Sequence, residues 1–115
     1  MTYSVELAAD AREDLAAIHD FLVDSYIAFG ENTANSLNRA DARIGAIGES
    51  LRALGDVPAQ GTLRPEIRVG LRNVTKDRAI IYFDVDDNIQ VVRILAIFYG
   101  GQDHQRHMLK RALSP

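Results

Sequence analysis

The residues of this sequence that could do chemistry are mostly basic side chains in its second half. Arginine and lysine bind phosphate or carboxylate groups, histidine can transfer a proton near neutral pH, and tyrosine can donate a hydrogen bond. Ten such residues are the candidates for contact with a target or a partner: Arg64, Arg68, Arg72, Lys76, Arg78, Arg93, Tyr99, His104, Arg106 and His107. Nothing in their order or spacing fixes a catalytic geometry, so no catalytic residue is assigned.

The charge of the chain is divided unequally between its two halves. The 115 residues carry a net charge of −3, but residues 1–60 hold four basic and ten acidic side chains (−6), whereas residues 61–115 hold nine basic and six acidic ones (+3). Such a separation favours a face that meets an anionic surface, either nucleic acid or an acidic protein. The alternative is that Arg68, Arg72, Lys76 and Arg78 only solvate strand edges and turns.

Arg93 interrupts an otherwise apolar predicted strand. An unpaired buried guanidinium is costly, so this charge must be exposed or paired, and Asp84 and Glu66 are the expected partners. Contact with a target or partner is the other interpretation. On a regular strand its side chain shares a face with Val91, Leu95 and Ile97.

His104 and His107 lie three residues apart on one predicted helical face, with Asp103 just before them. This spacing does not match zinc signatures, and neither a metal nor another cofactor is expected. Together with Arg106, Lys110 and Arg111 the histidines indicate a basic helix that docks on acidic protein or phosphate. Because the chain has no cysteine, thiolate chemistry and disulfides are excluded.

Apolar periodicity predicts a strand followed by two helices in the first half. Residues 2–7 alternate between polar and apolar types, which is typical of a half-buried strand. A helix then extends to residue 29, with Asp10 as its N-cap and Gly30 ending it. A second apolar stripe covers residues 31–54, so the two helices form an antiparallel hairpin.

Two features of this hairpin are open to interpretation. Gly45 and Gly48 lower the helix propensity of the second helix, or else they permit close packing. The acidic residues of the first helix are expected on its outer, solvated face: Asp14, Asp20 and Asp24.

The second half is predicted to contain three strands and a short helix. Residues 55–65 include two prolines and two glycines and form a surface connection. Residues 67–72 alternate, with Ile67, Val69 and Leu71 on the apolar face and Arg68 and Arg72 on the other. Strands at 79–85 and 89–98 are joined by a turn at Asp86-Asp87-Asn88. A helix over 104–113 follows, capped by Asp103.

This order predicts an α+β fold: an N-terminal strand, an antiparallel helical hairpin packed on one face of a three-stranded antiparallel meander, and a short C-terminal helix. A chain of 115 residues with 47% hydrophobic content suits one domain, residues 1–115. The N-terminus resembles no signal peptide, and no stretch reaches the roughly 20 apolar residues that span a bilayer. A cytoplasmic location without membrane contact is expected.

Several local strings occur in the order found in one toxin family. They are Ala11-x-x-Asp14-Leu15-x-x-Ile18, Pro58-x-x-Gly61, Gly70-Leu71-Arg72, Ile80-Ile81-Tyr82 with Asp84 and Asp86, and Val92-x-Ile94-Leu95-x-Ile97. Together with the element order, they make the chain resemble the ParE branch of the RelE/ParE toxin superfamily over nearly its whole length. The resemblance implies a single ParE-like toxin domain.

That resemblance also implies a function and partners. It implies the toxin of a type II toxin–antitoxin system, neutralised by direct binding of a cognate ParD-like antitoxin with a ribbon-helix-helix domain. The implied target is DNA gyrase, poisoned without catalysis or cofactor, so that replication and growth stop. Operator DNA would be contacted only indirectly, through the antitoxin.

Two alternatives stay open. The RelE branch resembles an mRNA-cleaving ribonuclease, in which basic residues and a tyrosine or similar group activate the ribose hydroxyl and stabilise the phosphorane-like charge. The residues offered for those roles are Lys76, Arg78, Arg93, Tyr99, His104 and His107. The other alternative is an inactive toxin-like binding protein.

The chain also departs from the family pattern, because residues 100–104 read Gly-Gly-Gln-Asp-His where many members carry a string like His-x-x-Arg-Asp.

Overall fold

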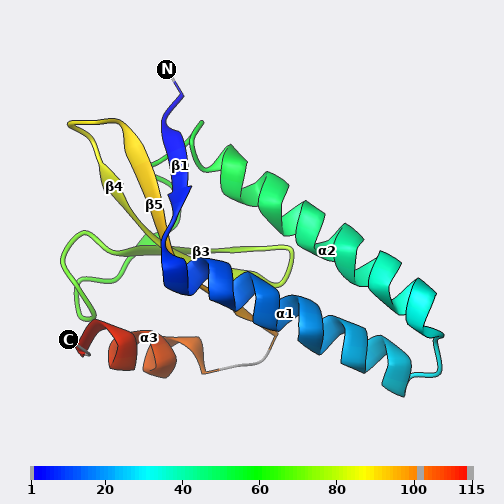
Figure 1. Cartoon of the computed structure of the whole chain (residues 1–115). Coiled ribbons are helices and arrows are strands. Elements are labelled where there is room, and N and C mark those ends of the chain that lie inside the picture. The colour runs from blue at the N-terminus through cyan, green and yellow to red at the C-terminus, as the bar shows by residue number, and fades with distance from the viewer. Residues whose placement is uncertain (1, 101–102, 114–115) are drawn as a thin grey trace.

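The computed structural model describes residues 2–100 and 103–113 and has the predicted order of elements (Figure 1). The elements are β1 (Ser4–Leu7), α1 (Ala9–Ala28), α2 (Thr33–Ala53), β2 (Thr62–Leu63), β3 (Arg72–Lys76), β4 (Ala79–Asp86), β5 (Val91–Tyr99) and α3 (His104–Leu113). The α+β prediction is therefore confirmed, with α1 and α2 as the antiparallel hairpin. No helix within the described ranges is long and apolar enough to cross a bilayer.

The two long helices begin with different caps. The side chain of Asn32 accepts a hydrogen bond from the backbone N–H of Asn35 at 2.8 Å and so caps α2. The N-cap of α1 is Ala8, which supplies no side-chain hydrogen bond. The prediction of Asp10 as N-cap was wrong by two residues, because the helix starts at Ala9 and Asp10 lies in its first turn. Gly30, at φ +98°, ends α1 as expected.

The five strands form one mixed sheet in the order β1-β5-β4-β3-β2. β1 runs parallel to β5, and the other neighbours are antiparallel. The register of β4 and β5 pairs Tyr82 with Ala96 and Phe83 with Ile94, so Leu95 is an extra residue in a β-bulge. The bulge changes which side chains face which side of the sheet.

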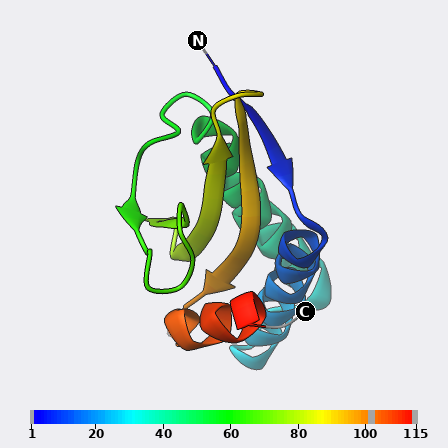
Figure 2. The ribbon, with the colours of Figure 1, turned by 90° about the vertical axis from the view of Figure 1, so that its left-hand side faces the viewer.

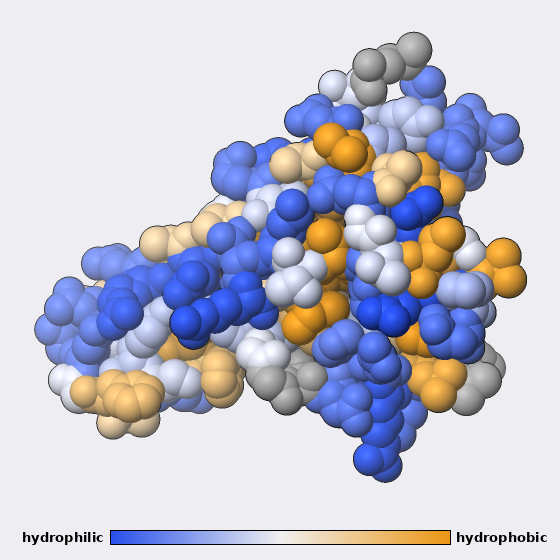
Figure 3. Space-filling view, turned by 180° about the vertical axis from the view of Figure 1, so that it is seen from behind, coloured by the Kyte–Doolittle hydropathy of each residue, from blue (hydrophilic) through white to orange (hydrophobic). Residues whose placement is uncertain are grey.

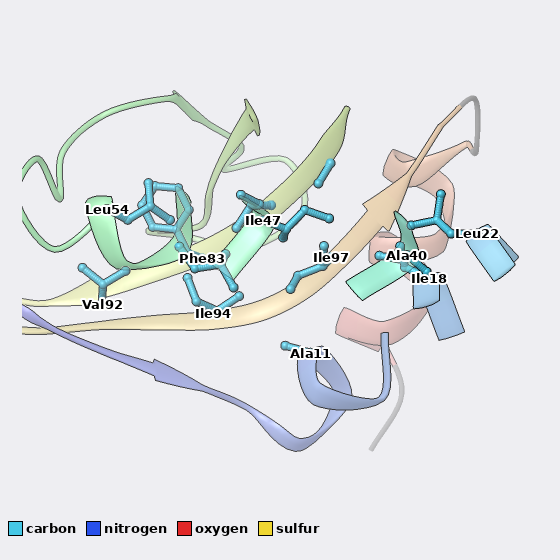
Figure 4. Packing of buried hydrophobic residues seen from close by; sticks show 13 residues of the cluster. Ala11, Ile18, Leu22, Ala40, Ile47, Leu54, Phe83, Val92, Ile94 and Ile97 are labelled. Atoms are coloured by element: carbon cyan, nitrogen blue, oxygen red, sulfur yellow. The ribbon is translucent and has the colours of Figure 1, made fainter. Parts of the chain in front are cut away.

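One face of the sheet carries the main core. Apolar residues of both long helices, among them Ile18, Leu22 and Ile47, pack there against Phe83 of β4 and Ile94 of β5 (Figure 4). Ile97 joins this cluster, whereas Leu95 belongs to a second one. The expectation that Arg93 shares a face with Ile97 was therefore wrong, because the bulge lies between them.

The opposite face of the sheet carries a smaller core under α3. Tyr82, Ala96 and Phe98 point to this side and are buried together with Leu71 and Met108. Figure 2 shows α3 lying across this end of the sheet. The fold thus has three layers at that end: the helical hairpin, the sheet and α3.

The strand predicted at residues 67–72 was wrong. Residues 65–70 form turns, in which Arg64 C=O accepts from the N–H groups of Ile67 and Arg68. Pro65 lacks an N–H and Gly70 has φ +82°, so this segment does not continue a ladder. Val69, expected on the apolar face, is 89% exposed. The third strand of the meander is β3, whose sequence Arg-Asn-Val-Thr-Lys gives a weaker apolar signal.

Two further segments, the connection after α2 and the turn between β4 and β5, also differ from the prediction. The predicted surface connection contains a short edge strand, β2, paired with β3. The turn between β4 and β5 spans residues 87–90 rather than 86–88, and Ile89, predicted in the strand, is 62% exposed. Gln90 has φ +56°, a left-handed conformation that a strand residue does not adopt.

The helical hairpin reaches beyond the sheet, as Figures 1 and 3 show. Its outer half keeps large apolar side chains in water: Ile27, Phe29 and Leu37 are 43%, 89% and 42% exposed. Gly45 and Gly48 of α2 do not mediate close packing, because a Cβ at either position would meet nothing within 4 Å.

Candidate functional site

A polar and aromatic cluster lies on the sheet face beneath α3. At its centre is Tyr82 of β4, whose side chain is fully buried but whose hydroxyl lies 2.8 Å from Nδ1 of His104, the first residue of α3. The ring of Phe98 packs edge-on against Tyr82 with centroids 5.9 Å apart. β4, β5 and α3 therefore position the three rings.

β3 and the loop before it extend the cluster. Asn73 is the cross-strand neighbour of Tyr82 and is itself buried. Its side-chain oxygen accepts a hydrogen bond from Nε of Arg64 at 3.3 Å. A row of hydrogen-bonding groups thus leads from Arg64 at the surface to His104.

The environment of Tyr82 favours its protonated form. Burial raises the pKa of Tyr82 above its ordinary value of 10.0, a hydrogen bond with Asn73 and the charge of Arg64 lower it, and the nearby carboxylates of Glu66 and Asp103 raise it. The hydroxyl therefore keeps its proton. When it donates to Nδ1 of neutral His104, the imidazole proton lies on Nε2.

α3 is attached to α1 by an ion pair that links the ends of the chain. Arg111 donates from Nη1 and Nη2 to the two carboxylate oxygens of Asp14, at 2.8 and 2.7 Å. Asp14 also accepts a hydrogen bond from the backbone N–H of Ile97 at 2.9 Å. Hydrogen bonding to Asp14 raises the pKa of Arg111 above its ordinary value, against the effect of burial. The expectation that Asp14 lies on a solvated face was wrong.

Aromatic contacts complete the attachment of α3. The ring of His107 stacks on Phe98 with centroids 5.9 Å apart, and the guanidinium of Arg111 lies 5.0 Å from the centroid of the same ring. Between α3 and the loop after β2 is a cavity of about 330 Å³. It is lined by Arg64, Glu66, Ile67, Asp103, Gln105, Arg106 and Leu109.

This arrangement combines two kinds of chemistry. An imidazole with an oriented ring can transfer a proton, and the guanidinium of Arg64 can bind an anion such as phosphate. Within residues 2–100 and 103–113, no group of three histidine, aspartate or glutamate side chains is placed to hold a metal ion.

Known proteins resemble this chain in structure rather than in sequence. No protein-family model matches the sequence, and no curated protein matches it. A chain of the chromosomal ParDE TA system from P. aeruginosa superposes with a TM-score of 0.63 and 25% identity, over 85% of this chain and 96% of that one. The chain has the RelE/ParE toxin fold.

Two further structures share the RelE/ParE fold with lower sequence identity. The toxin–antitoxin complex RelBE2 from Mycobacterium tuberculosis contains a chain with a TM-score of 0.59 and 16% identity, covering 87% of this chain and 100% of that chain. A double mutant of the E. coli toxin RelE in the free state has a TM-score of 0.61 and 9% identity, covering 99% of this chain and 100% of that chain.

The RelE/ParE fold brings only some of the predicted site residues together. Arg64 and Arg106 line the cavity beneath α3, whereas His104 contacts Tyr82 and His107 contacts Phe98 on the same face of the sheet. Arg68 and Arg93 share the carboxylate of Asp84, to which Arg93 Nη1 lies at 3.9 Å. Asp84 was one of the two partners expected for Arg93.

The other predicted residues lie elsewhere in the fold. Arg72 donates to the carbonyl of Ala59 at 3.0 Å and so ties the preceding loop to β3. Lys76 is the last residue of β3, and Arg78 lies in the two-residue turn between β3 and β4. Tyr99 packs on the opposite face of the sheet, edge-on to Phe21 with centroids 6.5 Å apart.

The unusual segment 100–104 is described only in part. Gly100, at φ +70°, donates its N–H to the carbonyl of Arg78 at 3.3 Å. Asp103 precedes α3, and its side chain accepts from the backbone N–H of Arg106 at 3.4 Å, which fits its predicted capping role. Gly101 and Gln102 lie outside the described residues.

Sequence reasoning missed several residues of the site. Tyr82 was noted only as part of a strand motif and Arg111 only as part of a basic helix, and Asn73 and Phe98 were not selected. A polar residue between buried neighbours was the available signal for Tyr82, because a buried hydroxyl needs a hydrogen-bond partner. Asp14 carried a similar signal, since it stands four residues before Ile18 on the same side of α1.

Proposed function

We propose that this chain is the toxin of a type II toxin–antitoxin pair and that residues 1–115 act as one toxin domain. The observation that carries the proposal is the superposition on the ParDE chain over 85% of this chain and 96% of that one, at 25% identity. Its cellular location is then the cytoplasm, where replication and translation can both be reached.

The neutralising partner is a ParD-like antitoxin that binds through an extended segment folding on the toxin. The support is physical. The outer half of the hairpin exposes apolar side chains, which mark a partner surface, and a disordered segment needs such anchors to offset its ordering entropy. Arg64, Arg68, Arg72 and Arg93 would attract an acidic segment and speed its association at low salt.

The target we favour is DNA gyrase. The ParDE structure matches with higher sequence identity than either RelE-type structure described above, 25% against 16% and 9%. The chain would act by occupying a surface of the gyrase–DNA complex rather than by catalysis.

A ribonuclease is the second candidate, and one observation favours it. Tyr82 holds His104 in a defined orientation beside Arg64, a combination that could transfer a proton and stabilise phosphate charge during RNA cleavage. His104→Gln and Arg64→Gln would then abolish toxicity, whereas a gyrase poison with its target surface elsewhere would tolerate both.

Controlled expression without antitoxin separates the candidates. Filamentous cells with DNA-damage signalling are expected for gyrase poisoning, and rapid translation arrest with cleaved mRNA is expected for a ribonuclease. Co-expression of the gene product encoded beside the toxin, if it is a ribbon-helix-helix protein, should restore growth. Unchanged growth upon expression would instead indicate a toxin-like binding protein without activity.

A further inference from the structure

A second cavity lies between α1, the end of β5 and α3, away from Tyr82 and His104. Its volume is about 530 Å³, within the usual range for ligand pockets. Much of its lining is aromatic, with Phe21, Phe98, Tyr99 and His107 around it and the Asp14–Arg111 pair at its wall. We propose that this cavity receives a bulky apolar side chain, such as tryptophan, from a basic segment of a partner polypeptide.

The apolar part of the proposal rests on the rim formed by α1. Phe21 is 58% exposed even though its ring lies edge-on to Tyr99. Ala17, one turn earlier, is exposed and leaves the cavity open on that side. An aromatic ring entering there would pack against Phe21 and Tyr99 and remove their surface from water.

The basic part of the proposal rests on the outer flank of α1. At 100° per residue, Glu13, Asp20 and Asp24 fall on the solvent side of the stripe formed by Ala17 and Phe21, and Asp10 continues that stripe toward the start of α1. All four are exposed, and in the described part of the chain none of them forms an ion pair. Lysine or arginine next to the anchor would meet this acidic flank, whereas a phosphate backbone would be repelled.

The charged pair in the wall of the cavity does not cancel this preference. Arg111 forms two hydrogen bonds with Asp14, and its charge also acts on Asp10 and Glu13. One guanidinium cannot neutralise all these carboxylates together with Asp20 and Asp24, so the net charge near the opening is negative. The proposal goes beyond toxin activity, because it concerns a polypeptide-binding site that exists whether or not the chain poisons gyrase.

The absence of tryptophan from the sequence gives a direct assay. The blocked tripeptide Lys-Trp-Lys is titrated with the full chain while its tryptophan emission is recorded, and Glu-Trp-Glu serves as the charge-reversed probe. We expect a saturable blue shift with Lys-Trp-Lys and roughly tenfold weaker binding of Glu-Trp-Glu, a ratio equivalent to about 1.4 kcal/mol. The Asp20→Asn/Asp24→Asn variant should reduce this difference.

Two matched variants test the position of the probe. Ala17→Phe fills the opening and should weaken Lys-Trp-Lys binding by roughly tenfold. Ala16→Phe places the same ring at the neighbouring exposed position, which does not line the cavity, and should bind as the parent chain does. Thermal melting of both variants checks that each remains folded.

Several outcomes would overturn the proposal. Equal binding by the Ala17→Phe and parent chains would place the probe elsewhere, and equal affinity for the two tripeptides would remove the role of the acidic flank. A parent chain that sediments as a dimer, and becomes monomeric with Ala17→Phe, would show that a second copy occupies the cavity. Displacement of Lys-Trp-Lys by a short single-stranded oligonucleotide would point to nucleic acid instead.

Discussion

Arg111, near the C-terminal end of α3, forms a two-fold hydrogen-bonded ion pair with Asp14, in the second turn of α1. The Asp14 side chain is 12% exposed, and its carboxylate also accepts a hydrogen bond from the backbone N–H of Ile97 in β5. One carboxylate thus joins the first helix, the last strand and the last helix. The position of α3 over Tyr82 depends on this junction.

Replacing Arg111 by Leu should loosen α3 and lower the free energy of unfolding. Asp14 would be left partly buried with only the Ile97 N–H as a partner, which costs roughly 1–3 kcal/mol. Amide exchange along α3 should become faster than in the parent chain. Arg106→Leu on the same helix is the control, and equal exchange in the two variants would argue against the junction.

Tyr82 should make the protein less stable at alkaline pH. The pKa of Tyr82 is raised above 10.0 in the fold, so this contribution is complete below pH 10 and is lost as pH rises from 10 through the folded-state pKa. Above pH 10 the unfolded chain releases the tyrosine proton while the folded chain still holds it. Denaturant unfolding from pH 9 to pH 11 measures the effect.

A second tyrosine must be removed from that measurement. The hydroxyl of Tyr3 donates to Asp87 at 2.9 Å, and this hydrogen bond raises the pKa of Tyr3 as well. The comparison is therefore between Tyr3→Phe and Tyr3→Phe/Tyr82→Phe. If both lose stability equally above pH 10, the buried environment of Tyr82 is not responsible.

Two serines of α2 should respond in opposite ways to alanine. Ser36 is fully buried, and its hydroxyl has no hydrogen-bond partner among the described residues, so Ser36→Ala should stabilise the protein by about 1 kcal/mol. Ser50 donates to Asp77 at 2.5 Å and ties α2 to the β3–β4 turn, so Ser50→Ala should be destabilising. The urea concentration at the unfolding midpoint should rise for Ser36→Ala and fall for Ser50→Ala, each compared with the parent chain.

Gly61 and Gly70 share a φ of +82° but differ in their surroundings. A Cβ at Gly70 meets nothing within 4 Å, so Gly70→Ala should cost only the strained backbone, roughly 1–2 kcal/mol. A Cβ at Gly61 would clash with the carbonyl oxygen of Asn73 and would push β2 away from β3. Gly61→Ala should therefore be the more destabilising by chemical denaturation; the reverse order would contradict the packing of this loop.

The sequence allowed the element order to be predicted because its helices and central strands have clear apolar periods. The 67–72 segment misled that reasoning, since Val69 lies in a turn and is exposed while Leu71, just before β3, is buried. Alternation alone does not separate a strand from successive turns. The bulge at Leu95 shifts the pattern by one residue, which no local signal revealed.

The candidate site was harder to predict than the fold. Its defining contacts join residues far apart in the chain, such as Asp14 with Arg111 and Tyr82 with His104. The basic residues selected from the sequence lie at several separate places in the fold. Arg72, for example, donates a hydrogen bond to the loop that precedes β3. Pairings of this kind follow from tertiary packing, so charge counts could indicate the residue types but not their arrangement.

The most direct test of the proposed function is a supercoiling assay with the purified chain, DNA gyrase, ATP and relaxed plasmid. We predict that the chain prevents supercoiling and causes cleaved plasmid to accumulate, and that prior addition of its ParD-like antitoxin restores supercoiled product. Full supercoiling activity at a large molar excess of the folded chain, with no cleaved plasmid, would contradict the assignment of gyrase as the target.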